Sequence, residues 1–285
     1  MRRLVPALAL GAAALVGVAG CSAGQGTASL GNMKLAAAEA VQVSAQKAEE
    51  VTSYSADLVV DATGPEGRSG TVQGRVVYQS RPEPSADVTL DVISFGGRNV
   101  PGGARVILLG DTVYAKSEAL TRFTGGSKPW TRASAADLEA GDRAEVDELL
   151  SRVQQFDLPG TVKLLTASKD VKAVGTETVG GVETVHYSGT FPVAEAVQAL
   201  APEEREQLQE EFSRAKSVKF DLWADAQSLP RKVTLSGSEE GATFTMAVHF
   251  ADFNEPVTIT APPADQVGDL PKDAGARPPA DSGGN

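Results

Sequence analysis

The sequence predicts an α+β domain built on one antiparallel sheet of about ten or eleven strands, with helices covering one face. Stretches of alternating apolar and polar residues recur along the chain, which is typical of half-buried antiparallel strands. The helical segments are few and interrupt the strands instead of alternating with them, which argues against a parallel α/β fold. A sheet this wide with one apolar face must curl or be covered.

The alternation is clearest over 54–61, where Tyr, Ala, Leu and Val occupy the even positions and Ser or Asp occupies three of the four odd ones. Gly110-Asp111 and Gly180-Gly181 each separate two such stretches, and they predict two-residue hairpins. The predicted strands cover 54–61, 72–79, 86–92, 105–109, 112–116, 176–179, 182–191, 218–222, 233–235 and 244–250.

Three segments predict helices. Leu35–Val51 is rich in Ala, Glu and Gln. Ala135–Phe156 carries apolar residues at spacings of three and four, which gives a helix one apolar face. Pro192–Ala215 has the same spacing in two parts, the second opened by Pro202.

The N-terminus predicts a lipoprotein signal peptide over residues 1–20. Two arginines precede an uncharged, Ala-rich segment, and Val18-Ala19-Gly20-Cys21 resembles the bacterial lipobox, in which the cysteine receives a diacylglycerol. The segment is shorter than the roughly 20 apolar residues of a membrane span. We therefore expect a protein anchored by lipidated Cys21 to the cell membrane, on its extracytoplasmic face. The alternative is an ordinary secretory peptide with an incidental cysteine.

Composition divides the rest of the chain. Residues 21–33 are rich in Gly, Ser and Thr and predict a flexible tether. Residues 262–285 contain five prolines and four glycines with few large apolar residues, and they predict a disordered tail. The folded domain is thus expected at 34–261.

The 285-residue chain carries a net charge of -11, which argues against nucleic-acid binding because that affinity comes from cations that neutralise phosphates. The chain has one cysteine and two histidines, which are few side chains from which to build a metal site or a catalytic triad. We expect no cofactor. His186 and His249 are expected to face solvent. A Gly-x-Ser-x-Gly-like stretch at 20–24 lacks a preceding strand, and the acidic cluster at 203–211 is interpreted as the wet face of a helix.

The inward-facing residues are mostly Val, Ala, Leu and Gly, with few aromatic side chains to fill space. The part of this face that the helices leave uncovered is either packed shut or open to an apolar ligand. Trp130 is interpreted as a core residue or as part of an opening, and Trp223 as an outward residue that could contact a partner. The residues expected to line an apolar cavity are Leu58, Val60, Val72, Val76, Tyr78, Val88, Leu90, Val92, Val106, Leu108, Val113, Leu149, Val153, Val185, Tyr187, Phe220, Leu222, Phe244, Met246 and Val248.

Several short motifs follow one another along the chain. They are Val113-Tyr114-Ala115-Lys116, Lys128-Pro129-Trp130, Gly175-Thr176-Glu177 with Gly181 to Tyr187, Leu222-Trp223-Ala224-Asp225 with Leu229 to Lys232, and Asp252 to Val257. Taken in their order and spacing, they make the segment from Cys21 to about Val267 similar to the LppX/LprAFG family of actinobacterial lipoproteins, which is related in fold to the LolA-type carriers. Two positions depart from the family pattern, since Ser228 and Asn254 stand where glycine is common.

The resemblance implies a curved antiparallel half-barrel whose concave face, closed by helices, holds acyl chains of envelope lipids or glycolipids. Some relatives transfer lipids and cooperate with a membrane transporter, and the resemblance carries over no catalytic residue. We expect a monomeric lipid-binding or lipid-transfer lipoprotein and no enzyme. The alternative is an envelope lipoprotein of the same fold that binds a protein and carries no lipid.

Overall fold

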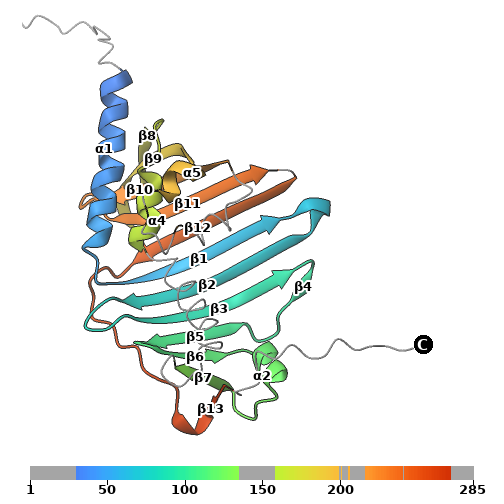
Figure 1. Cartoon of the computed structure of the whole chain (residues 1–285). Helices are drawn as coiled ribbons and strands as arrows, with labels where there is room; N and C mark the ends of the chain where they lie inside the picture. The colour runs from blue at the N-terminus through green and yellow to red at the C-terminus, as the bar shows by residue number, and fades with distance from the viewer. Residues whose placement is uncertain are drawn as a thin grey trace, which may run out of the picture.

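The computed structural model describes residues 30–134, 158–198, 200, 205, 216–239 and 241–270. They form one open sheet of 13 strands in the order β13-β7-β6-β5-β3-β2-β1-β12-β11-β10-β9-β8, with β4 paired to β3 (Figure 1). The strand pairs are antiparallel, except that β13 runs parallel to β7. The strands are β1 Ser53–Thr63, β2 Ser69–Gln79, β3 Ser85–Phe95, β4 Arg98–Asn99, β5 Ala104–Leu109, β6 Thr112–Lys116, β7 Trp130–Ser134, β8 Lys172–Val179, β9 Val182–Pro192, β10 Ser217–Asp225, β11 Pro230–Glu239, β12 Ala242–Ala251 and β13 Val267–Asp269. The helices are α1 Leu30–Glu49, α2 Glu118–Thr124, α4 Leu158–Leu165 and α5 Val193–Val197, with single 3-10 turns at Pro65–Gly67 and Ala264–Gln266.

The predicted antiparallel sheet is confirmed, and it has more strands than expected. The ten predicted segments all form strands, and the hairpins at Gly110 and Gly180 join β5 to β6 and β8 to β9. The additional strands are β4, β7 and β13, which are two, five and three residues long. The two- and three-residue strands β4 and β13 contain too few alternating positions to give a pattern in the sequence.

Helix α1 packs on the sheet through a stripe of small residues. Ala37, Val41, Ala45 and Ala48 recur three or four residues apart, and each is at most 7% exposed. Because alanine side chains are short, this face lets the helix axis approach its neighbours closely. The predicted helix at 35–51 is confirmed, and it begins at Leu30.

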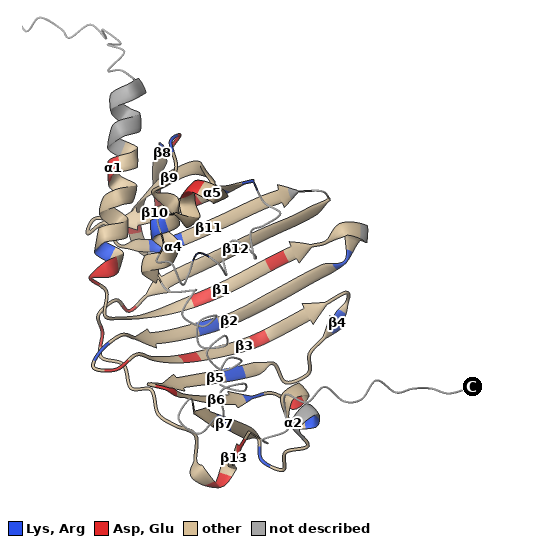
Figure 2. Cartoon of the chain, viewed as in Figure 1, with Lys and Arg blue, Asp and Glu red and all other residues tan. Residues whose placement is uncertain are grey.

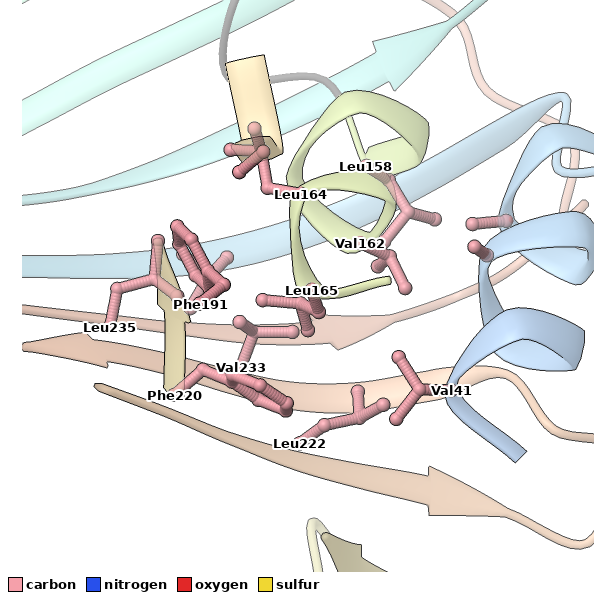
Figure 3. Close-up of a cluster of buried hydrophobic side chains, with 14 of the residues drawn as sticks. Val41, Leu158, Val162, Leu164, Leu165, Phe191, Phe220, Leu222, Val233 and Leu235 are labelled. Carbon is pink, nitrogen blue, oxygen red and sulfur yellow. The ribbon is translucent and has the colours of Figure 1, made fainter. Parts of the chain in front are cut away.

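Helix α4 completes the core beside α1 and is a helix that the sequence did not predict. Leu158, Val162 and Leu165 are fully buried. Figure 3 shows Leu158 and Val162 on the side of α4 that faces α1, and Leu165 pointing toward Val233 of the sheet. Pro159 and Gly160 make the segment look like a loop, but proline is tolerated in the first turn of a helix, where its missing N–H would have no partner. We call the sheet face that packs against α1 and α4 the inner face, and the opposite one the outer face.

The other helical predictions are tested only in part. The helix expected at 135–156 lies outside the described residues, as do Leu149 and Val153. Of the segment 192–215, α5 confirms the beginning, and the acidic cluster lies mostly outside the described part. Helix α2 was not predicted. It is seven residues long and begins where the Ser117 hydroxyl accepts a hydrogen bond from the Leu120 amide at 3.0 Å.

The C-terminal segment is ordered further than its composition predicts. Val267–Asp269 pairs with β7, Arg132 forms an ion pair with Asp269 at 2.9 Å, and the Leu270 amide donates to the Arg132 carbonyl. Disorder from residue 262 onward is therefore wrong for 262–270, and residues 271–285 lie outside the described part. The expectation weighed only apolar burial, whereas backbone pairing and polar contacts hold this segment.

Both departures from the family pattern keep the backbone conformation that glycine favours. Ser228 has φ 63° and Asn254 has φ 60°. The Asn254 amide oxygen accepts hydrogen bonds from the Thr52 amide and hydroxyl at 2.8 and 3.0 Å, so its side chain contributes to the turn. The Ser228 turn is held by Asp225, whose carboxylate accepts from two backbone amides.

Candidate functional site

The strand register brings most of the predicted lining residues onto the inner face. One line of paired residues crosses the sheet through Leu222, Val233, Val248, Leu58 and Leu90, with Gly74 between the last two. A parallel line joins Phe220, Leu235, Met246, Val60 and Val72. Since directly paired residues share a face, these side chains form one apolar surface. Tyr78, Val106, Leu108, Val113, Val185, Tyr187 and Phe244 lie on the same face.

The inner face has two parts that differ in exposure. On the α1 and α4 side, Phe220 and Leu222 are fully buried, and Val248 is 9% exposed. Farther along the face, Leu108 of β5 and Val113 of β6 belong to a second buried cluster together with Ala86 of β3. Between these clusters lie apolar residues that are only half-buried, and we call them the apolar strip: Leu58, Val60, Val72, Val76, Val88 and Leu90.

A β-bulge corrects one predicted lining residue. Asp91 is an extra residue in β3, so Gly74 pairs with Leu90 whereas Gln73 pairs with Val92. Val92 consequently faces outward and is 36% exposed, and Ile93 takes the inner position opposite Val72. The bulge reverses which residues point inward. The adjacent apolar pair Val92-Ile93 is the signal in the sequence that could have indicated this change.

Glycines on the inner face make room for large side chains of neighbouring strands. A Cβ atom at Gly70 would lie 2.9 Å from the Phe95 ring, and one at Gly74 would lie 2.8 Å from the Leu90 side chain. At Gly237 the corresponding distance to the Phe244 ring is 2.5 Å. The side chains of Phe95, Leu90 and Phe244 thus lie over these glycines.

The outer face over β1 to β5 is polar. Arg75 pairs with Asp57 at 2.9 Å and Arg105 with Asp87 at 2.6 Å, each across neighbouring strands. Figure 2 shows these acidic and basic positions along β1, β2, β3 and β5. Such exposed pairs contribute little to stability, but they mark this face as the one in contact with water.

The prediction that His186 faces solvent is wrong, because its side chain is only 12% exposed. Its Nδ1 lies 2.9 Å from Glu177 and its Nε2 2.9 Å from Asp221, while the ring stacks on Trp223 at 4.3 Å. Burial alone would raise the pKa of Asp221, but hydrogen bonds from His186 and Ser188 and nearby positive charge lower it overall. This outer-face cluster ties β8, β9 and β10 together.

Both tryptophan side chains are buried and contact residues of the domain itself. Trp223 is 8% exposed, donates its Nε1–H to Glu177 at 3.0 Å and has the Lys232 ammonium 4.6 Å from its ring centre. It therefore offers little surface to a partner. Trp130 is 5% exposed and pairs with Val267 of β13, which supports its interpretation as a core residue.

His249 lies on the outer face and is exposed, as predicted. Partial burial and the Lys232 charge lower its pKa, while Asp57 opposes that shift. Among the described residues, no group of three or more His, Cys, Asp or Glu side chains could hold a metal ion. No helix in the described part of the chain is long and apolar enough to cross a membrane.

Comparison with known protein families shows to which family this chain belongs. The sequence pattern of the LppX_LprAFG lipoprotein family matches residues 36–259, which is most of the chain. The chain belongs to this lipoprotein family. Cys21 precedes the matched region, so its lipidation stays a prediction.

Two Streptomyces proteins are relatives of this family member. An uncharacterized 31.2 kDa protein of Streptomyces griseus is 34% identical over 181 residues, which cover 60% of this chain and 59% of that protein. A putative lipoprotein of Streptomyces coelicolor is 26% identical over 162 residues, covering 57% and 50%. The chain thus matches between half and three fifths of the length of these relatives.

Solved structures of LppX_LprAFG lipoproteins are similar over nearly their whole length. The Mycobacterium tuberculosis lipoprotein LppX has a TM-score of 0.44 at 18% identity, covering 79% of this chain and 99% of LppX. LprF from Mycobacterium bovis has a TM-score of 0.46 at 14% identity, covering 80% and 97%.

Proposed function

We propose that this LppX_LprAFG lipoprotein binds acyl chains of envelope lipids or glycolipids on its apolar strip and transfers them while anchored to the membrane. The observation that carries the proposal is the strip itself, a row of aliphatic side chains that the described helices leave only partly buried. Monomeric soluble proteins rarely expose a contiguous apolar patch of this kind without a use for it. Membership of a lipoprotein family supports the same reading.

Desolvation is the driving force that the strip can supply. Each buried methylene contributes about 0.8 kcal/mol, and a chain of many methylenes therefore gains several kcal/mol after the cost of association. The strip carries no charged side chain, so it favours the hydrocarbon part of a lipid. It would not by itself distinguish one acyl lipid from another.

The anchor is proposed to be Cys21, which would carry diacylglycerol after cleavage of residues 1–20. Two or more acyl chains give effectively stable membrane attachment. The domain would lie on the extracytoplasmic face, and a membrane transporter is the proposed source or acceptor of lipid. Labelled palmitate should enter the wild-type protein and be absent from Cys21→Ala. Label that still enters the variant contradicts the anchor.

A bulky residue within the strip tests lipid binding. Val88 is half-buried and pairs with Val76 and Val106, so Val88→Trp should fill the strip and reduce the lipid that co-purifies with the protein from its own host. Thr89→Trp is the matched control, because Thr89 pairs with Arg75 on the outer face.

Native mass spectrometry of the mature chain carrying Cys21→Ala provides the measurement. We expect lipid in the wild type and in Thr89→Trp and less in Val88→Trp, with all three proteins giving the same circular dichroism spectrum. Equal lipid in both tryptophan variants overturns the assignment of the strip. An empty wild-type protein favours the alternative, a family member that acts by binding another protein.

A further inference from the structure

The tip of the β3–β4 hairpin carries an aromatic and a basic residue on the inner face. Phe95 pairs with Gly70 on one side and with Arg98 on the other, so the three positions share one face. Phe95 is 62% exposed, and Arg98 is exposed as well. The bulge at Asp91 creates this arrangement, because without the extra residue Phe95 would point outward.

Arg98 is unusual among the charges of the sheet. At the inward positions of β1, β2, β3, β4, β5 and β12, as the structure describes them, it is the one charged residue. Figure 2 shows its basic position on β4, apart from the charges along the middle of the sheet. The outward arginines Arg75 and Arg105 each pair with a carboxylate. Within the described part of the chain, Arg98 forms no such pair.

The hairpin tip leaves space around this guanidinium. Gly96 and Gly97 have φ values of 57° and 77°, which suits a two-residue turn. A Cβ atom at either glycine would have nothing within 4 Å. The tip is thus open on the side of these glycines, and the exposed Arg98 follows directly after them.

The dimensions of the strip match an acyl chain that begins at this tip. Gly70, beside Phe95, and Val76, in the middle of the strip, are separated by six residues of β2, or about 20 Å at about 3.3 Å per residue. One leaflet of a bilayer has about half of the roughly 30 Å hydrocarbon thickness. At about 15 Å, an acyl chain that begins beside Gly70 would thus extend along the strip past Gly74, four residues or about 13 Å away, with its headgroup at the hairpin.

We propose that Arg98 binds the phosphate of a lipid headgroup whose acyl chains lie on the apolar strip. The inference rests on the proposed function and deepens it, because it names phosphate-bearing lipids as the preferred ligands. Guanidinium groups bind phosphate through two parallel hydrogen bonds. A net charge of -11 repels anions from the protein as a whole, so a preference for an anionic lipid requires a local cation such as this one.

Competition between two lipids with identical acyl chains tests the proposal. The mature chain carrying Cys21→Ala is mixed with equal amounts of phosphatidic acid and diacylglycerol in detergent micelles, and native mass spectrometry measures the bound fraction of each. We expect the wild type to prefer phosphatidic acid by about tenfold or more, since hydrogen bonds between charged groups are the stronger ones. Arg98→Gln should bind both lipids equally.

Arg75→Gln is the matched control, because it removes the same charge from the outer face and should keep the preference. A preference that survives in Arg98→Gln overturns the headgroup site while lipid binding stands. A preference lost equally in Arg75→Gln also overturns it, because a general charge effect then explains the selectivity. A wild type that binds neither lipid overturns the proposed function itself, so the two failures are distinguishable.

Discussion

The turn between β10 and β11 depends on one buried carboxylate, and replacing it should strongly destabilise the domain. The Asp225 side chain is 1% exposed and pairs with Arg231 at 2.7 Å. Its other oxygen accepts hydrogen bonds from the amides of Gln227 and Leu229 at 2.9 and 3.0 Å. Asp225→Ala removes all three interactions and leaves the turn without its central acceptor.

The expected loss follows from these contacts. Breaking a buried ion pair by removing one partner costs about 3–5 kcal/mol. The Arg231 side chain is 21% exposed and can recover some hydration, which favours the lower end of that range. The two amides lose an acceptor at about 1 kcal/mol each, although Gln227 is exposed and can bond to water. We therefore expect Asp225→Ala to lower the free energy of unfolding by about 3–4 kcal/mol.

Urea unfolding followed by circular dichroism measures this loss as a shift of the midpoint at constant slope. Asp225→Asn should lose less, because it keeps an acceptor oxygen for both amides. Asp57→Ala removes an exposed carboxylate of the outer face and should leave the midpoint almost unchanged. A loss below about 1 kcal/mol for Asp225→Ala, or an equal loss for all three variants, would refute the reasoning.

Two further predictions concern single polar groups. Ser44 is fully buried in α1, and among the residues that the structure describes its hydroxyl has no hydrogen-bond partner, so Ser44→Ala should raise the free energy of unfolding by about 1 kcal/mol; a lower urea midpoint would contradict this. The folded-state pKa of Asp221 lies below its ordinary 3.8, so its contribution is complete above that pH and is lost as the pH falls through the folded value. The stability difference between the wild type and Asp221→Asn, measured by urea unfolding, should therefore shrink from about pH 5 to about pH 3, and a constant difference would argue against it.

The alternation of the sequence predicted the sheet well because register and alternation are linked. In β1, Leu58 and Val60 face inward as expected, since each pairs with an inward residue of β12. The prediction failed at Val92 because a single extra residue, Asp91, reverses the alternation. The alternation within one strand carries no information about its partner strand. A bulge is recognised only from the pairing with that partner.

Elements held by tertiary contacts were the least predictable. Helix α4 contains Pro159 and Gly160, which local propensity disfavours, yet Leu158, Val162 and Leu165 are fully buried against the sheet and α1. Burial of this size outweighs a propensity cost of a few kcal/mol. Strand β13 similarly depends on β7, which lies more than 130 residues away in the sequence.

The two parts of the inner face explain why the chain has so few aromatic residues. Where α1 and α4 cover the sheet, rings such as Phe191 and Phe220 fill the space, with ring centres 6.2 Å apart. In the apolar strip over β1, β2 and β3 the inward residues are Val and Leu, and the helices that the structure describes do not seal them. Full burial of a Val or Leu side chain stabilises a protein by about 1.5–3 kcal/mol, so a sequence selected for stability alone would have covered this surface. An acyl ligand would supply the missing burial, and the strip would gain its stability from the molecule that it binds.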